Sequence, residues 1–219
     1  MDLVPTQTER FNTYMNTYNS KTEEDIKLAY RKWAPFYEWH IVDMGWDAPR
    51  LCAELLCNNM PTANNITPAI KVLDVACGTG LVGAELRTLV YGKNIVLHGI
   101  DLSNEMLAEC SKKSCYDKLW DMNAERMCSL EDCTYDGIIC VGALNFGHIP
   151  PTAFNEFIRV TKPGGNICFS TRADFYQTSS KEIQNQLTLI GAWLLLEKRH
   201  YTGEAVKDME HIHWCYRKI

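Results

Sequence analysis

The sequence lacks several features that would indicate particular classes of protein. Its longest apolar stretches, such as residues 191–196, are far shorter than the roughly 20 residues that a membrane-spanning helix needs. It has no long block of lysines or arginines and its formal net charge is -5, so we expect no nucleic-acid partner. Its first residues lack the basic stretch and apolar run of a secretory signal. We therefore expect a cytoplasmic protein with no membrane partner.

The cysteines show no pattern typical of metal or disulfide sites. There are ten, but no C-x-x-C pair occurs, and Cys52/Cys57, Cys110/Cys115 and Cys128/Cys133 are each separated by four residues. Reduced cysteine usually behaves as a small buried hydrophobe. We expect free thiols and no bound metal.

The length and composition indicate one domain with a short extension. The 219 residues are 46% hydrophobic, which allows one substantial core. We expect a flexible N-terminal segment at 1–22 and a single domain at 23–219. Helical patterns at 23–36 and 49–58, followed by a turn-rich linker, predict a helical cap over the site at 23–60.

From residue 70 onward, strand-like and helix-like stretches alternate. The strand-like stretches are 70–76, 94–100, 118–122, 135–141, 166–171, 192–200 and 211–217, and the helix-like ones are 81–90, 104–113 and 154–161. Alternation of this kind predicts a parallel sheet covered by helices on both faces. The last two strands are joined by a short polar loop and should pair antiparallel. The fold class expected is α/β, a doubly wound, Rossmann-like, mostly parallel seven-stranded sheet with an antiparallel C-terminal strand pair.

The junction after the first strand has the pattern of a ligand-binding turn. Gly78 and Gly80 lie where a ligand approaches the backbone closely in doubly wound sheets. Asp101 ends the second strand, 23 residues beyond Gly78, where a carboxylate can accept hydrogen bonds from ribose hydroxyls. An adenosine-bearing ligand follows from the two features together.

The spacing of the glycines does not decide between a dinucleotide and S-adenosylmethionine. G-T-G-L-V-G at 78–83 satisfies the dinucleotide pattern. Asp74, however, would repel a pyrophosphate and would attract the ammonium group of a methionine moiety. The charge therefore favours S-adenosylmethionine.

Four segments resemble the motifs of class I S-adenosylmethionine-dependent methyltransferases, in the same order. They are VLDVACGTGLVG at 72–83, GIDLSNEML at 99–107, YDGIICVGAL at 135–144 and VTKPGG at 160–165. Segments 30–56 and 141–154 more narrowly resemble the methyltransferase-like family named for the Williams–Beuren syndrome chromosome region. The resemblance implies S-adenosylmethionine as cofactor, S-adenosylhomocysteine as product and methyl transfer as the activity.

The resemblance also implies which residues hold the cofactor. Asp74 would lie near the ammonium group, Asp101 would hold the ribose, and Asp121 would accept from the adenine amino group, with Asn123 as the alternative to Asp121. The full set is Asp74, Gly78, Thr79, Gly80, Asp101, Leu102, Met106, Asp121, Met122, Val141, Gly142 and Ala143.

Three aromatic residues of the first helical stretch share one face. Tyr30, Trp33 and Tyr37 are spaced i, i+3 and i+7. They could close over the cofactor, where rings attract a sulfonium cation, or they could be ordinary core packing.

The chemistry expected is in-line displacement, for which the protein positions a nucleophile and removes a proton where needed. Candidate bases are His148, His40 and Asp174, with His148 preferred because its ordinary pKa suits proton removal near neutrality. The aromatic cap favours a small-molecule acceptor with an N or O nucleophile. A protein methyltransferase and a non-catalytic S-adenosylmethionine-binding protein are the alternatives. We expect a monomer or weak homodimer.

Overall fold

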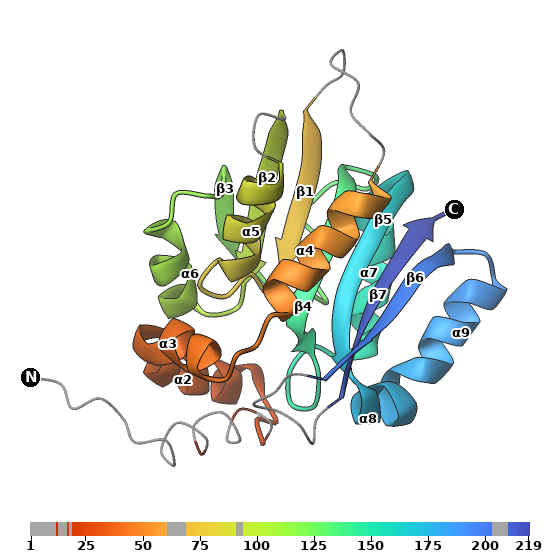
Figure 1. Cartoon of the computed structure of the whole chain (residues 1–219). Helices are drawn as coiled ribbons and strands as arrows, with labels where there is room; N and C mark the ends of the chain where they lie inside the picture. The colour runs from red at the N-terminus through yellow and green to blue at the C-terminus, as the bar shows by residue number, and fades with distance from the viewer. Residues whose placement is uncertain (1–11, 13–16, 18, 61–68, 91–93, 203–209) are drawn as a thin grey trace, which may run out of the picture.

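A seven-stranded sheet forms the centre of the molecule, with strand order β3-β2-β1-β4-β5-β7-β6 (Figure 1). The computed structural model describes residues 12, 17, 19–60, 69–90, 94–202 and 210–219, so most of the expected N-terminal segment lies outside the described residues. The strands are β1 (Ile70–Val75), β2 (Ile95–Asp101), β3 (Lys118–Asp121), β4 (Tyr135–Leu144), β5 (Thr161–Arg172), β6 (Trp193–Tyr201) and β7 (His211–Lys218). The predicted number of strands is confirmed.

The strand directions also follow the prediction. β1 pairs parallel with β2 and β4, β2 with β3, and β4 with β5. β7 is antiparallel to both β5 and β6. The predicted doubly wound sheet with an antiparallel C-terminal pair is therefore confirmed.

Both faces of the central strands β1, β4 and β5 are buried, because successive strand residues point to opposite sides and both kinds are apolar. Leu73, Ile138 and Ile167 face a core that also contains Phe154 and Phe157 of α7 (Phe154–Val160). Their neighbours in sequence face a second core, which is formed with α4 (Ala48–Asn59) and α5 (Leu81–Leu89). The remaining helices around the sheet are α6 (Asn104–Ser111), α8 (Ala173–Phe175) and α9 (Lys181–Leu189), with 3-10 turns at Ala34–Phe36 and Pro151–Ala153 and a π-helical turn at Tyr176–Ser180.

Helix α4 does not lie over the site, which differs from the predicted cap at 23–60. Cys52, Leu55 and Leu56 of α4 are fully buried in the second core, against the sheet and α5. The apolar face of α4 buries more apolar surface against the sheet than it would above a polar site, so packing on the sheet is favoured.

The cap therefore consists of α2 (Glu23–Trp33), the turn Ala34–Phe36 and α3 (Tyr37–Asp43). Figure 1 shows α2 and α3 beyond the carboxyl ends of β1 and β2. Thr22 and Asp25 form a capping box that fixes the start of α2. Pro35 lacks a backbone N–H and lies in the turn that separates the two helices, where the sequence pattern had predicted one continuous helix.

No helix among the described residues is both long enough and apolar enough to span a bilayer.

His213 on β7 is buried, and its titration tests the burial of this strand. Burial, with a contribution from the positive Arg199, lowers the pKa of His213 from 6.5 to about 4. Between these values the unfolded chain binds a proton that the folded chain does not, so the free energy of unfolding should fall as the pH drops from 6.5 to about 4. His213→Phe keeps the ring that stacks on Tyr201 and removes the titration. Urea denaturation over this pH range should show a shallower fall for the variant, by up to about 3 kcal/mol. The same pH dependence of the free energy of unfolding in both proteins would contradict the lowered pKa of His213.

Candidate functional site

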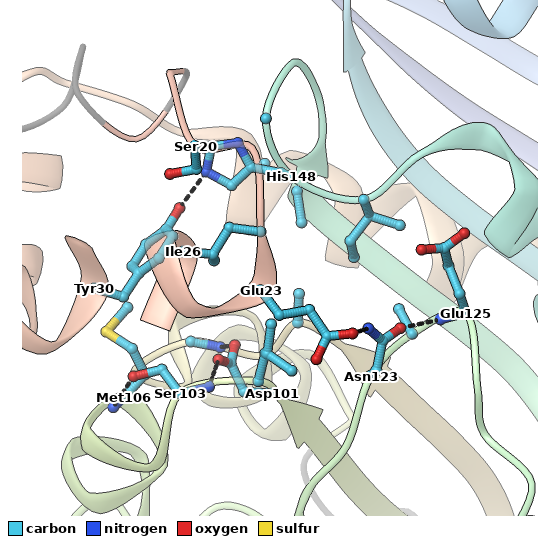
Figure 2. Close-up of a pocket in the computed structure, with 18 of the residues that line it drawn as sticks. Ser20, Glu23, Ile26, Tyr30, Asp101, Ser103, Met106, Asn123, Glu125 and His148 are labelled. Atoms are coloured by element: carbon cyan, nitrogen blue, oxygen red, sulfur yellow. Dashed lines mark hydrogen bonds between the residues drawn. The ribbon is translucent and has the colours of Figure 1, made fainter. Parts of the chain in front are cut away.

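A cavity of about 320 Å³ lies at the carboxyl ends of β1, β2, β3 and β4, beneath α2. We call it the main cavity. Its floor and walls come from the loops after these strands, and its roof comes from residues 20–23, Ile26 and Tyr30 (Figure 2). A parallel sheet places ligand sites at this edge. Of the predicted cofactor residues, those that line it are Tyr30, Tyr37, Gly78, Asp101, Leu102, Met106, Met122, Val141, Gly142 and Ala143.

Asp101 is held in a fixed orientation by backbone N–H groups. The N–H of Gly78 donates to Oδ2 at 2.8 Å, and the N–H of Ser103 donates to Oδ1 at 2.9 Å. Burial raises the pKa of Asp101 to about 6, and these two hydrogen bonds oppose the rise. Near neutral pH the group is therefore mainly a carboxylate, which can accept hydrogen bonds from hydroxyl groups in the cavity.

Gly78 allows close approach to the backbone beside Asp101. Its φ is +54°, a left-handed conformation that favours glycine. A Cβ at this position would lie 3.4 Å from the Cε of Met106, on the cavity wall. The turn thus presents bare backbone to a ligand.

The loop after β3 brings Asn123 to the cavity and leaves Asp121 away from it. β3 ends at Asp121, which is exposed and accepts a hydrogen bond from Asn104 at 3.0 Å. The side-chain amide of Asn123 donates to Glu23 at 2.6 Å, and its oxygen accepts the N–H of Glu125 at 2.7 Å (Figure 2). Of the two alternatives left by the sequence, only Asn123 lines the main cavity.

The aromatic residues Tyr30, Trp33 and Tyr37 of the cap form a stripe that borders two cavities. Tyr30 and Tyr37 line the main cavity, whereas Trp33 does not. The Trp33 ring is buried behind them, stacked on Tyr30 at 5.7 Å and edge-on to Tyr37 at 4.8 Å, and it lines a smaller adjacent cavity. The stripe is therefore both core packing and cavity wall.

His148 lines the main cavity and contacts the cap. Its Nδ1 lies 2.8 Å from the carbonyl oxygen of Phe146, and its Nε2 lies 2.8 Å from the hydroxyl of Tyr30. Because a carbonyl can only accept, Nδ1 carries the proton, and neutral His148 accepts the Tyr30 hydroxyl at Nε2. Burial lowers the pKa of His148, which favours this neutral form.

The other two candidate bases do not line the main cavity. His40 is buried within the cap and accepts a hydrogen bond from the indole of Trp33. Asp174 lies at the start of α8 and pairs with Arg172. Because the turn at Pro35 redirects the cap, and because β5 extends to Arg172, neither side chain reaches the cavity wall.

Three residues of the first motif also lie behind the cavity. Thr79 is buried, and a Cβ at Gly80 would lie 2.8 Å from the Sγ of Cys110. Asp74 is fully buried, and the hydroxyl of Tyr116 donates to it at 2.6 Å. Burial raises the pKa of Asp74 to about 8 despite that hydrogen bond. Asp74 is therefore neutral near pH 7, and the structure does not place it where the charge argument required it.

Some residues of the cavity were missed by the sequence analysis. Ser103 is the N-cap of α6 and accepts the N–H of Met106, a pattern that a serine before a helix could have indicated. Glu23 and Ile26 carry no motif, because they reach the site only through the packing of the cap. Within the described residues, no group of three or more His, Cys, Asp or Glu side chains is arranged to hold a metal ion.

Comparison with known proteins finds similarity to methyltransferases. Residues 72–165 match the family described as "Methyltransferase domain". Human methyltransferase-like protein 27 is 35% identical over 170 residues, which are 75% of this chain and 66% of that protein. The malonyl-(acyl-carrier protein) O-methyltransferase of Pectobacterium atrosepticum is 32% identical over 127 residues, 57% of this chain and 46% of that protein. The chain thus spans about half to two thirds of the length of these relatives.

Solved structures show the same fold at low identity. Magnesium protoporphyrin IX methyltransferase from Synechocystis, with bound SAM, has a TM-score of 0.58 at 14% identity and covers 95% of this chain and 91% of that chain. The cyclase SpnF has a TM-score of 0.66 at 16% identity, covering 91% of this chain and 97% of that chain.

Asp74→Asn tests the protonation state of the buried carboxyl. The folded pKa of about 8 lies above the ordinary 3.8, so the folded chain keeps a proton that the unfolded chain loses, and the stability falls as the pH rises between these values. Asparagine stays neutral in both states. The variant should therefore unfold with a higher free energy than the wild type above about pH 6, by the order of a few kcal/mol. Asp121→Asn, on the exposed Asp121, is the matched control in the same denaturation series. A variant less stable than the wild type at alkaline pH would refute this account.

Proposed function

The chain belongs to the class I S-adenosylmethionine-dependent methyltransferases, and from that premise we propose that it transfers a methyl group from S-adenosylmethionine to an oxygen or nitrogen atom of a small molecule. S-adenosylmethionine is the cofactor of this family, and the residues of the main cavity fit it. The observation that carries the proposal is the oriented Asp101 carboxylate beside the bare backbone of Gly78, at the edge of a cavity of about 320 Å³.

Each part of the cofactor has suitable residues. Asp101 would accept the ribose hydroxyls, and Leu102 and Met106 would cover the adenine. Asn123 would meet the adenine amino group with its side-chain oxygen, which otherwise accepts a backbone N–H. Residues 141–143 would lie beneath the methionine portion.

The bound cofactor would supply an activated methyl group, and the chain would supply position and a route for a proton. Tyr30 and Tyr37 would exclude water from the roof of the main cavity. The acceptor's proton would pass to the Tyr30 oxygen as the Tyr30 proton moves to Nε2 of His148, which leaves His148 as an imidazolium with Nδ1–H still on the Phe146 carbonyl. His148 is the candidate base that this geometry supports.

The names of several curated relatives support methyl transfer to oxygen. They include a malonyl-(acyl-carrier protein) O-methyltransferase and ubiquinone biosynthesis O-methyltransferases. The cap over the main cavity supports a small acceptor better than an extended one. A protein acceptor would need an open groove. The fold alone does not decide the reaction, because SpnF, named as a [4+2]-cyclase, shares it. A cytoplasmic location and a monomeric or weakly dimeric state stay predictions.

Asp101→Ala should weaken cofactor binding. The substitution removes a charged hydrogen-bond acceptor and also the anchor of the Gly78 turn. We therefore expect calorimetry to show an affinity for S-adenosylhomocysteine that is about 10–100-fold lower. Asp121→Ala removes a carboxylate outside the cavity and should change the affinity little. If the wild-type chain releases no heat with S-adenosylmethionine or S-adenosylhomocysteine, while a nicotinamide dinucleotide binds, the assignment of the main cavity is wrong.

Turnover is tested by S-adenosylhomocysteine formation with a metabolite panel and, separately, with proteins from a cell extract. We expect product with the metabolites and none above background with the proteins. His148→Gln should lower the rate with a metabolite by about 100-fold or more, as for loss of a general base. Product only with proteins would replace the small-molecule proposal, and binding of the cofactor without product in either panel would favour a non-catalytic protein.

A further inference from the structure

A second, smaller cavity adjoins the main cavity on the side of α3. It has a volume of about 40 Å³. Among the residues that the structure describes, those that line both cavities are Tyr30, Tyr37, Gly142 and His148. Since residues 141–143 are the ones expected beneath the methionine portion, the smaller cavity opens where the reactive methyl group would lie.

The walls of the smaller cavity are aromatic on its cap side. Trp33 and Trp46 line it together with Ile41 and Met44. Trp46 lies directly over Gly142, because a Cβ at that glycine would be 2.6 Å from the Cη2 of the indole. Gly142 has φ +76°, so both its conformation and this contact require glycine.

The described residues that line this cavity carry no formal charge near neutral pH. None is a lysine, arginine, aspartate or glutamate. The two histidines are neutral, because burial lowers the pKa of His148, and burial with nearby His213 and Arg172 lowers the pKa of His211 to about 4. An ion entering the cavity would lose hydration without meeting a counter-ion.

The volume limits the occupant to a small group. About 10–15 Å³ of such space holds one water, so this cavity has room for about three waters, comparable to one small ring. One face of Trp33 is already covered by the stacked ring of Tyr30, which leaves that face unavailable to a cation.

We propose that the smaller cavity is the acceptor pocket of the methyltransferase, and that it takes an uncharged compound with one small ring or a group of similar size, bearing an O–H or N–H that meets the Tyr30 hydroxyl. The proposal rests on the proposed function and adds the class of acceptor. An alkylammonium has no lone pair with which to attack, so the exclusion of cations also selects the nucleophilic form of an amine. A carboxylate acceptor is excluded because no cation among the described lining residues would bind it.

Four single-ring probes of similar size test the charge requirement. Near neutral pH phenol and aniline are uncharged, benzoate is an anion and benzylamine is a cation. Each is titrated by NMR into the full chain saturated with S-adenosylhomocysteine. Phenol and aniline should bind at least about tenfold more tightly than the two ions. Equal or tighter binding of either ion overturns the proposal, and so does binding of none of the four. Failure of S-adenosylhomocysteine itself to bind would instead overturn the proposed function.

The location is tested by filling the cavity. Met44 lines it and is half-buried, so Met44→Trp adds bulk where the chain can adjust. Val42→Trp adds the same bulk at a residue of α3 that is 75% exposed and lines neither cavity. Met44→Trp should weaken phenol binding by at least about tenfold and leave the affinity for S-adenosylhomocysteine within about twofold. Val42→Trp should change neither. Unchanged phenol binding in Met44→Trp overturns the location.

A measurement on the wild-type chain keeps the test independent of any folding defect. Intermolecular NOEs should connect phenol protons to the Met44 methyl or the Trp46 ring. NOEs only to residues outside the smaller cavity would overturn the proposal.

Discussion

The hydrogen bond from the Gly78 N–H to Asp101 joins the two structural signals on which the site depends. It connects the turn after β1 to the end of β2, which pair in parallel up to Val75 and Ile100. Asp101 is therefore not simply a carboxylate near a glycine turn, because it holds that turn in its left-handed conformation. In return, the turn fixes one oxygen of Asp101 and leaves the carboxylate directed at the cavity. In the proposed function, cofactor binding and local folding would use the same atoms.

The cap is held over this site mainly by packing. Arg31 pairs with Glu105 of α6 at 2.6 Å, and Lys113 joins Glu38 to the carbonyl of Thr79, but these groups are partly exposed. Exposed ion pairs contribute about 0–1 kcal/mol each. Burial of a large aromatic side chain such as Trp33 contributes about 1.5–3 kcal/mol or more. Trp33 packs on Tyr30, and the Tyr30 ring packs edge-on against His148 at 5.7 Å. Burial of these rings therefore outweighs the exposed ion pairs of α2 and α3.

The sheet and much of its ligand edge were predictable, because they depend on local signals. Apolar strands, glycine turns and Asp101 carry their information in short segments. The cap was harder to predict, since Pro35 divides a helical pattern and the apolar face of α4 packs on the sheet. α9 was not assigned because its segment is mostly polar and only Gln184 and Leu187 are buried. Glu23 and Ile26 reach the cavity through tertiary packing, which no motif encodes. The placement of His40 and Asp174 failed for the same reason.

Asp74 and Asp101 show why a charge in a motif is weak evidence until its environment is known. Both are buried, yet the pKa of Asp74 is raised to about 8 and that of Asp101 to about 6. Asp101 accepts two backbone N–H groups that stabilise its ionised form, whereas Asp74 has one hydrogen bond, from Tyr116. The two pKa values differ by about 2, so ionising Asp74 costs about 3 kcal/mol more than ionising Asp101. Asp101 can therefore serve as a charged acceptor of ligand hydroxyls, while Asp74 acts as a neutral support that, through Tyr116, fixes the start of α5 at Gly83. An argument from the sign of the charge alone treats the two carboxyls alike. Their different hydrogen-bond donors, together with the negative Asp101 beside Asp74, separate a carboxylate that can bind hydroxyls from a structural carboxyl.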